Sequence, residues 1–77
     1  MYLKEALKMI LAEVRSARRK HPTWPKDAVY QAAIVQEEAG ELVKAALEHV
    51  QEGKSEIRMI VEAIQVAAVA IRLLTRS

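Results

Sequence analysis

The apolar residues of this 77-residue chain recur at helical spacing in three separate segments. The first extends from about Tyr2 to Lys20, where intervals of three and four residues predict an amphipathic helix. Its apolar stripe consists of Leu3, Leu7, Ile10, Val14 and Ala17. The basic run Arg18–Lys20 suits the negative end of the helix dipole, and Pro22 ends the helix.

A second helix is predicted from about Asp27 to Glu52. Asp27 is a typical N-cap, because its short side chain can accept a hydrogen bond from the first helical turn. Gly53 is a typical end, and Ser55 a typical N-cap for a third helix from about Glu56 to Thr75. The apolar face of the second helix is expected to consist of Ala28, Ala32, Val35, Ala39, Leu42, Ala46 and Val50.

The third helix is apolar around most of its circumference, which is typical of a buried helix. Its polar residues fall on one narrow stripe of Arg58, Glu62, Gln65, Arg72 and Arg76, which must face water or a polar cleft. A chain this short buries only about 60% of its unfolded surface, yet 52% of its residues are hydrophobic. The sequence therefore predicts one all-α domain over residues 1–77, a three-helix bundle completed by homo-oligomerisation, at least as a homodimer.

The composition narrows the class of protein. The net charge is +2, with acids and bases interspersed, so nothing requires a nucleic-acid partner. The chain has no cysteine, which excludes disulfides and thiolate chemistry. Its N-terminal segment does not resemble a signal peptide, and no apolar stretch is long enough to span a membrane. We expect a soluble, cytoplasmic protein with no membrane partner.

The segment IVQEEAGELVKA, residues 34–45, places Glu37, Glu38 and Glu41 on neighbouring positions of an apolar helix. Such like charges repel each other. The second and third helices are joined by a short turn and should pack antiparallel, which brings Glu62 to the same height as these acids. Carboxylates that converge between helices bind hard divalent cations, so we expect a Mg²⁺ or Mn²⁺ site.

The EEAGE stretch, followed after twenty residues by Glu62 and then by Gln65, resembles the EExxE…ExxD signature of the MazG-like all-α nucleotide pyrophosphohydrolases. The resemblance extends from about residue 24 to residue 74. It implies a Mg²⁺-dependent enzyme, dimeric or tetrameric, that cleaves a nucleoside triphosphate into the monophosphate and pyrophosphate.

The resemblance also implies roles for individual residues. Glu38, Glu41 and Glu62 correspond to metal ligands, and Glu37 corresponds to an acid that binds metal or orients water, so Glu37 and Glu38 are the candidate catalytic residues. Gln65 stands where the family has aspartate. Its carbonyl can ligate Mg²⁺, but it supplies no negative charge and cannot act as a base.

Two further residues are candidates for binding substrate. Trp24 can stack on a nucleobase or cap the core beside its flanking prolines, and Arg58 can contact the nucleotide. The basic end of the first helix can meet a triphosphate or simply complement the helix dipole. Gly40 costs about 1 kcal/mol relative to alanine in a helix, which suggests close approach by another helix or a ligand.

Simpler interpretations of the acidic residues stay open. Glu37, Glu38 and Glu41 can form a solvated acidic face, and Glu62 and Gln65 can form a polar seam that sets helix register. The alternative function is a non-catalytic helical oligomer whose degenerate site binds a nucleotide or a protein partner, and Gln65 favours it.

Overall fold

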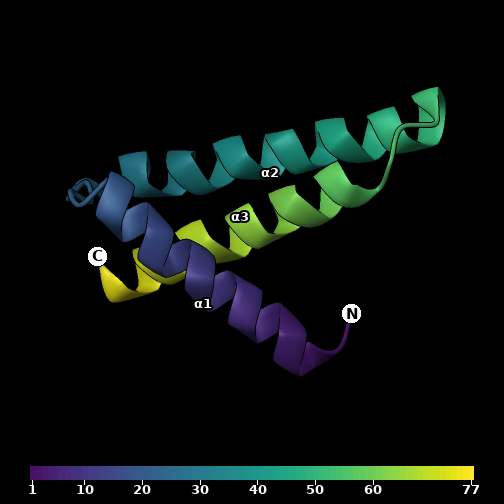
Figure 1. The fold of residues 1–77 in the computed structure, drawn as a ribbon. Coiled ribbons are helices and arrows are strands. Elements are labelled where there is room, and N and C mark those ends of the chain that lie inside the picture. The colour runs from purple at the N-terminus through teal and green to yellow at the C-terminus, as the bar shows by residue number, and fades with distance from the viewer.

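The computed structural model describes residues 1–77 and contains three helices and no strands: α1 (Leu3–Lys20), α2 (Ala28–Glu52) and α3 (Ile57–Thr75). The helices α2 and α3 form an antiparallel hairpin, and α1 crosses α3 (Figure 1). Helix α1 packs on α3 and not on α2. The predicted all-α helical bundle is confirmed.

The ends of the helices follow the capping residues. Asp27 Oδ1 accepts a hydrogen bond from the Val29 amide at 3.1 Å, as expected of an N-cap. Gly53 takes a left-handed conformation with φ of 68°, which a residue without Cβ adopts at no steric cost. The N-cap of α3 is Glu56 and not Ser55 as predicted, but Ser55 Oγ still accepts from the Ile57 amide at 3.2 Å and so satisfies one free donor of α3.

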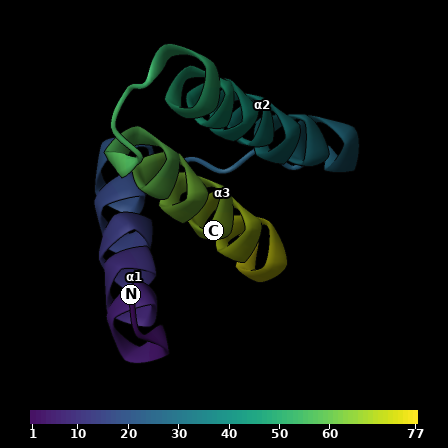
Figure 2. The same ribbon diagram turned by 90° about the vertical axis from the view of Figure 1, so that its right-hand side faces the viewer.

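The buried core of the single chain is small. Its apolar members are one residue from each helix, Val14, Ala45 and Ala68. The apolar stripe of α1 is buried only toward its C-terminal end, because Leu3 and Leu7 stay 75% and 50% exposed. Figure 2 shows why: the N-terminal half of α1 extends away from the α2–α3 hairpin.

Within the single chain α3 is only partly covered, as expected of a helix whose burial requires an oligomer: Ala68 and Arg72 are buried along it, and α1 and α2 leave the rest of its surface half-covered or open. One expectation about burial needs correction. The apolar face expected for α2 is rotated, since Val50 is 79% exposed while the polar Gln31 is buried. Gln31 is accommodated because its Nε2 donates to the Pro25 carbonyl at 2.7 Å. Oligomerisation stays a prediction.

Arg72 joins the ends of α1 and α3. It is only 4% exposed, and its Nη2 donates to the His21 carbonyl at 2.6 Å, while its Nε donates to the Ser77 carbonyl at 3.1 Å. Its guanidinium carbon lies 5.0 Å from the centre of the Trp24 ring, a cation–π distance. Burial, and then repulsion by Arg18, lowers the pKa of Arg72. Main-chain oxygens hold this charge, and no Asp or Glu side chain pairs with it.

We predict that Arg72→Met lowers the free energy of unfolding by about 2–4 kcal/mol, because it leaves part-buried main-chain oxygens without their donor and removes the contact with Trp24. Chemical denaturation at one fixed protein concentration measures this. Arg19→Met, at an exposed arginine in the last turn of α1, is the matched control and should change stability by less than about 0.5 kcal/mol. Equal effects of the two substitutions would contradict the role given to Arg72.

Candidate functional site

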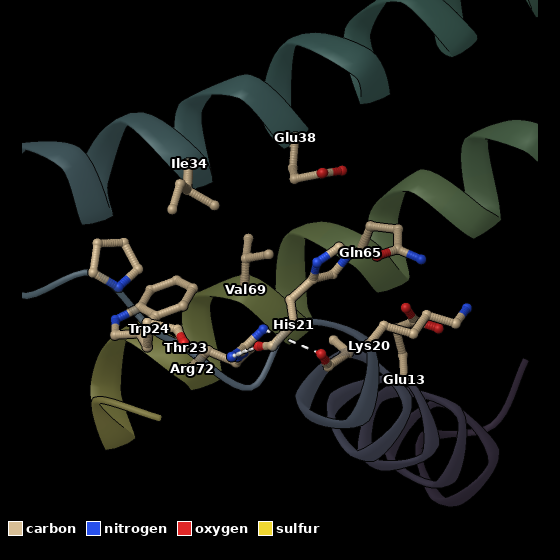
Figure 3. A pocket seen from close by; sticks show the side chains of 12 residues that line it. Glu13, Lys20, His21, Thr23, Trp24, Ile34, Glu38, Gln65, Val69 and Arg72 are labelled. Atoms are coloured by element: carbon tan, nitrogen blue, oxygen red, sulfur yellow. Dashed lines mark hydrogen bonds between the residues drawn. The ribbon is translucent and has the colours of Figure 1, made fainter.

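A pocket opens where α1 and α2 stand apart on either side of α3. Its volume is about 360 Å³, within the range of small-molecule sites. Residues of all three helices and of the α1–α2 loop line it: Glu13, Ala17, Lys20, His21, Thr23, Trp24, Pro25, Ile34, Glu38, Gln65, Val69 and Arg72. Figure 3 shows this pocket, with Glu38 reaching in from α2 and Gln65 carried by α3.

The apolar lining of the pocket gathers near the loop. Ile34 of α2, Val69 of α3 and the Trp24 ring contribute to it. Trp24 is half-buried, and the Arg72 guanidinium holds its ring in place. A flat apolar ligand would find here a preformed aromatic wall, because the loop position is fixed by hydrogen bonds from Arg72 and Gln31.

The acidic cluster consists of five carboxylates from three helices: Glu13, Glu37, Glu38, Glu41 and Glu62. Glu38 is at its electrostatic centre. Burial raises the pKa of Glu38, and repulsion by Glu62, Glu37, Glu41 and Glu13 raises it further, in that order. The largest of these repulsions comes from the opposite helix. The antiparallel hairpin therefore brings Glu62 into electrostatic range of Glu38.

The acidic cluster is not a preassembled metal centre. Nowhere in the chain do three His, Cys, Asp or Glu side chains lie close enough together to hold a metal ion. Its donor chemistry nevertheless suits a hard cation, because Mg²⁺ commonly takes one or two carboxylates and completes its shell with water and substrate phosphates. The residues fit an ion shared with a phosphate ligand, and the Mg²⁺ or Mn²⁺ site stays a prediction.

The structure gathers some of the sequence-predicted site residues and separates others. Trp24, Glu38 and Gln65 line the pocket. Glu41 and Glu62 influence Glu38 but do not line the pocket, and the same holds for Glu37, which lines a shallow surface hollow of α2 instead.

Arg58, expected to contact substrate, lies outside this pocket. Its Nη1 is 3.6 Å from Glu48 Oε2, and it lines none of the pockets. It precedes Gln65 by two helical turns, about 10 Å along α3. The geometry therefore pairs Arg58 with the second half of α2 and not with a ligand in the pocket.

Sequence reasoning missed part of the pocket lining. Glu13 was not singled out, because only the crossing angle of α1 on α3 brings it beside Gln65 and Glu38. His21 was given no role, yet it lines the pocket beside Lys20 and Thr23. Arg72 was seen only as a member of the polar stripe of α3. Because this stripe must face water or a polar cleft, it was the signal that could have identified Arg72 as a pocket residue.

Comparisons with known proteins give no relative for this chain. No family model, no curated protein and no solved structure matches it. None of its three helices combines the length and the apolar character needed to cross a membrane. The case for a function therefore depends on the residues and their geometry.

We predict that Glu38→Gln stabilises the metal-free protein near neutral pH and has little effect at acidic pH. A carboxyl whose pKa is raised on folding stabilises the fold while protonated and loses that contribution as pH rises through its folded pKa. The wild-type melting temperature should therefore fall over that pH window, and the variant should fall less. Melting curves in chelator across pH 4–8 test this. Glu52→Gln, outside the acidic cluster, is the control and should keep the wild-type pH dependence.

Proposed function

We propose that this chain is a Mg²⁺-dependent nucleoside triphosphate pyrophosphohydrolase of the MazG-like kind, which releases a nucleoside monophosphate and pyrophosphate. One observation carries the proposal: the acidic cluster is centred on Glu38, and Glu38 also lines a pocket with an aromatic wall. Acids beside an apolar pocket suit a ligand with a flat base at one end and a metal-bound phosphate chain at the other.

Different residues of the pocket would bind the base and the phosphates of the ligand. Trp24, with Ile34 and Val69, would receive the base, because the ring face is apolar and its position is fixed. Lys20 lines the same pocket and would supply a positive charge toward the phosphates. Arg72 would contribute less to phosphate binding than Lys20, since main-chain oxygens already accept from three of its five N–H groups and its guanidinium covers Trp24.

The acids would carry the chemistry. One or two of Glu38, Glu41 and Glu62 would hold Mg²⁺ together with the phosphates of the ligand. The ion would supply neutralisation of the phosphate charge and a lowered pKa for a bound water. Glu37 would orient the attacking water, and Glu38, which lines the pocket, would accept its proton. The repulsion within the acidic cluster is the reason that a cation is favoured there.

A non-catalytic oligomer that binds a nucleotide or protein partner is the second candidate, and Gln65 favours it. Gln65 lines the pocket with Glu38 and Glu13, at the position where the family signature has aspartate. Its amide can accept or donate hydrogen bonds but adds no charge for a metal. A site with this substitution can keep ligand binding while losing turnover.

We predict Mg²⁺-dependent pyrophosphate release from at least one member of a panel of nucleoside and deoxynucleoside triphosphates. Glu38→Gln and Glu62→Gln should each lower the release by about 100-fold or more, without loss of helical content, since each removes a repelling charge. Glu52→Gln, purified in the same way, controls for contaminating hydrolases. Release that survives in both cluster variants would refute the enzyme proposal.

We predict that Gln65→Asp tightens Mg²⁺ binding, because it returns a negative charge to the pocket beside Glu38. Wild type and variant are compared by the Mg²⁺-dependent shift of melting temperature, which reports occupancy, and by pyrophosphate release. In the enzyme, the variant gains both. In a degenerate site, it gains metal affinity with at most a trace of turnover. A variant that is destabilised and gains neither would assign Gln65 to the packing of the bundle.

A further inference from the structure

The outward face of α2 carries a heptad pattern that the single chain does not use. Seven exposed positions are spaced alternately by four and three residues: Val29, Ala33, Gln36, Gly40, Val43, Leu47 and Val50. This set, the α2 seam, is apolar or small at every position except Gln36. Its large members are strongly exposed, from 49% at Leu47 to 79% at Val50. Alternating spacing of this kind, sustained over three heptads, is the pattern by which two helices pack along their length.

Gly40 lies at the middle of the α2 seam and has no function within the chain. A Cβ built on it meets no atom within 4 Å, so packing inside the chain does not require a glycine there. A glycine in the middle of a helix weakens it. The missing side chain allows another helix to approach the backbone of α2 closely, and no such helix comes from this chain.

We infer that a second copy of the chain covers the α2 seam, with the two α2 helices antiparallel and crossing at Gly40. A two-fold axis at the crossing places Val29 and Val50 of opposite copies near each other and buries the seam along about 30 Å. The inference stands whether or not the chain is an enzyme, because it uses the outer face of α2 and not the pocket.

The charges beside the α2 seam fix the direction of the pair. Glu37 precedes Gly40 by three residues and Lys44 follows it by four, both are exposed, and neither makes an ion pair within the chain. An antiparallel pair brings Glu37 of each copy to the height of Lys44 of the other, twice by symmetry. A parallel pair would instead bring Glu37 level with Glu37. Charge complementarity therefore favours the antiparallel arrangement.

The pair also changes the acidic cluster. Glu37 belongs to that cluster, so Lys44 of the other copy would supply it with a positive charge that the single chain does not place there. Repulsion among Glu37, Glu38 and Glu41 would be weaker in the dimer than in the single chain. The partner thus completes the electrostatics of the cluster.

Sedimentation of the full chain over a concentration series tests the interface, with two leucines of equal exposure as a matched pair. Leu47, in the α2 seam, is 49% exposed, and Leu7, on the open face of α1, is 50% exposed. Leu47→Glu should raise the dimer dissociation constant at least about tenfold, because it places two charges in an apolar interface, whereas Leu7→Glu should leave it unchanged. A monomeric wild type, or a dimer lost only in Leu7→Glu, overturns the inference.

A charge exchange tests the orientation without depending on the apolar core. Glu37→Lys and Lys44→Glu should each weaken the dimer, and the double variant should recover it, since the two residues are seven apart and meet only across the interface. The chain has no cysteine, so Gly40→Cys should form an intermolecular disulfide while Val29→Cys alone should not. Absence of recovery in the double variant, or equal crosslinking at both positions, overturns the antiparallel arrangement.

Discussion

One buried cation ties α3 to the end of α1 and to the loop that leads into α2. Arg72 comes from α3 and gives its donors to the carbonyls of His21 at the end of α1 and of Ser77 beyond α3, while its guanidinium covers Trp24 in the loop. Helices α1 and α2 do not pack on each other, so their relative position depends on how each of them packs on α3. The pocket lies in the angle between α1 and α2, and the Arg72 contacts with His21 and Trp24 close one end of it. An arginine is suited to the position because its planar fork can satisfy several carbonyls at once and stack on a ring.

Repulsion is the second organising feature. Carboxylates of its own helix, of α3 and of α1 repel the negative charge of Glu38. Burial removes part of the water that would screen this repulsion. A protein of this size has little free energy to spare for such a cluster. Positive charge from a ligand-bound cation on the inner side of α2, and from another copy on its outer side, would lower the same repulsion from two directions. Both faces of α2 would thus contribute to lowering the repulsion within the acidic cluster.

The helices and their ends followed from the sequence because they depend on local chemistry. Asp27 and Gly53 act through their own backbone neighbours, and three- and four-residue spacing is a local property. The pocket did not follow, since Glu13 enters it only through the angle at which α1 crosses α3, and periodicity does not encode that angle. The face of α2 that meets α3 was also misjudged, because α2 has apolar residues on more than one side and Gln31 is buried by hydrogen bonding, not by hydrophobicity.

The closer packing of the C-terminal half of α1 has a consequence for how the fold opens. The Arg72 contacts and the buried Val14 hold the C-terminal half of α1, whereas Leu3 and Leu7 project into solvent. The free energy of local opening therefore declines along α1 toward its N-terminus. Amide protons in its first turns should therefore exchange faster than those around Val14, although the whole segment is one regular helix.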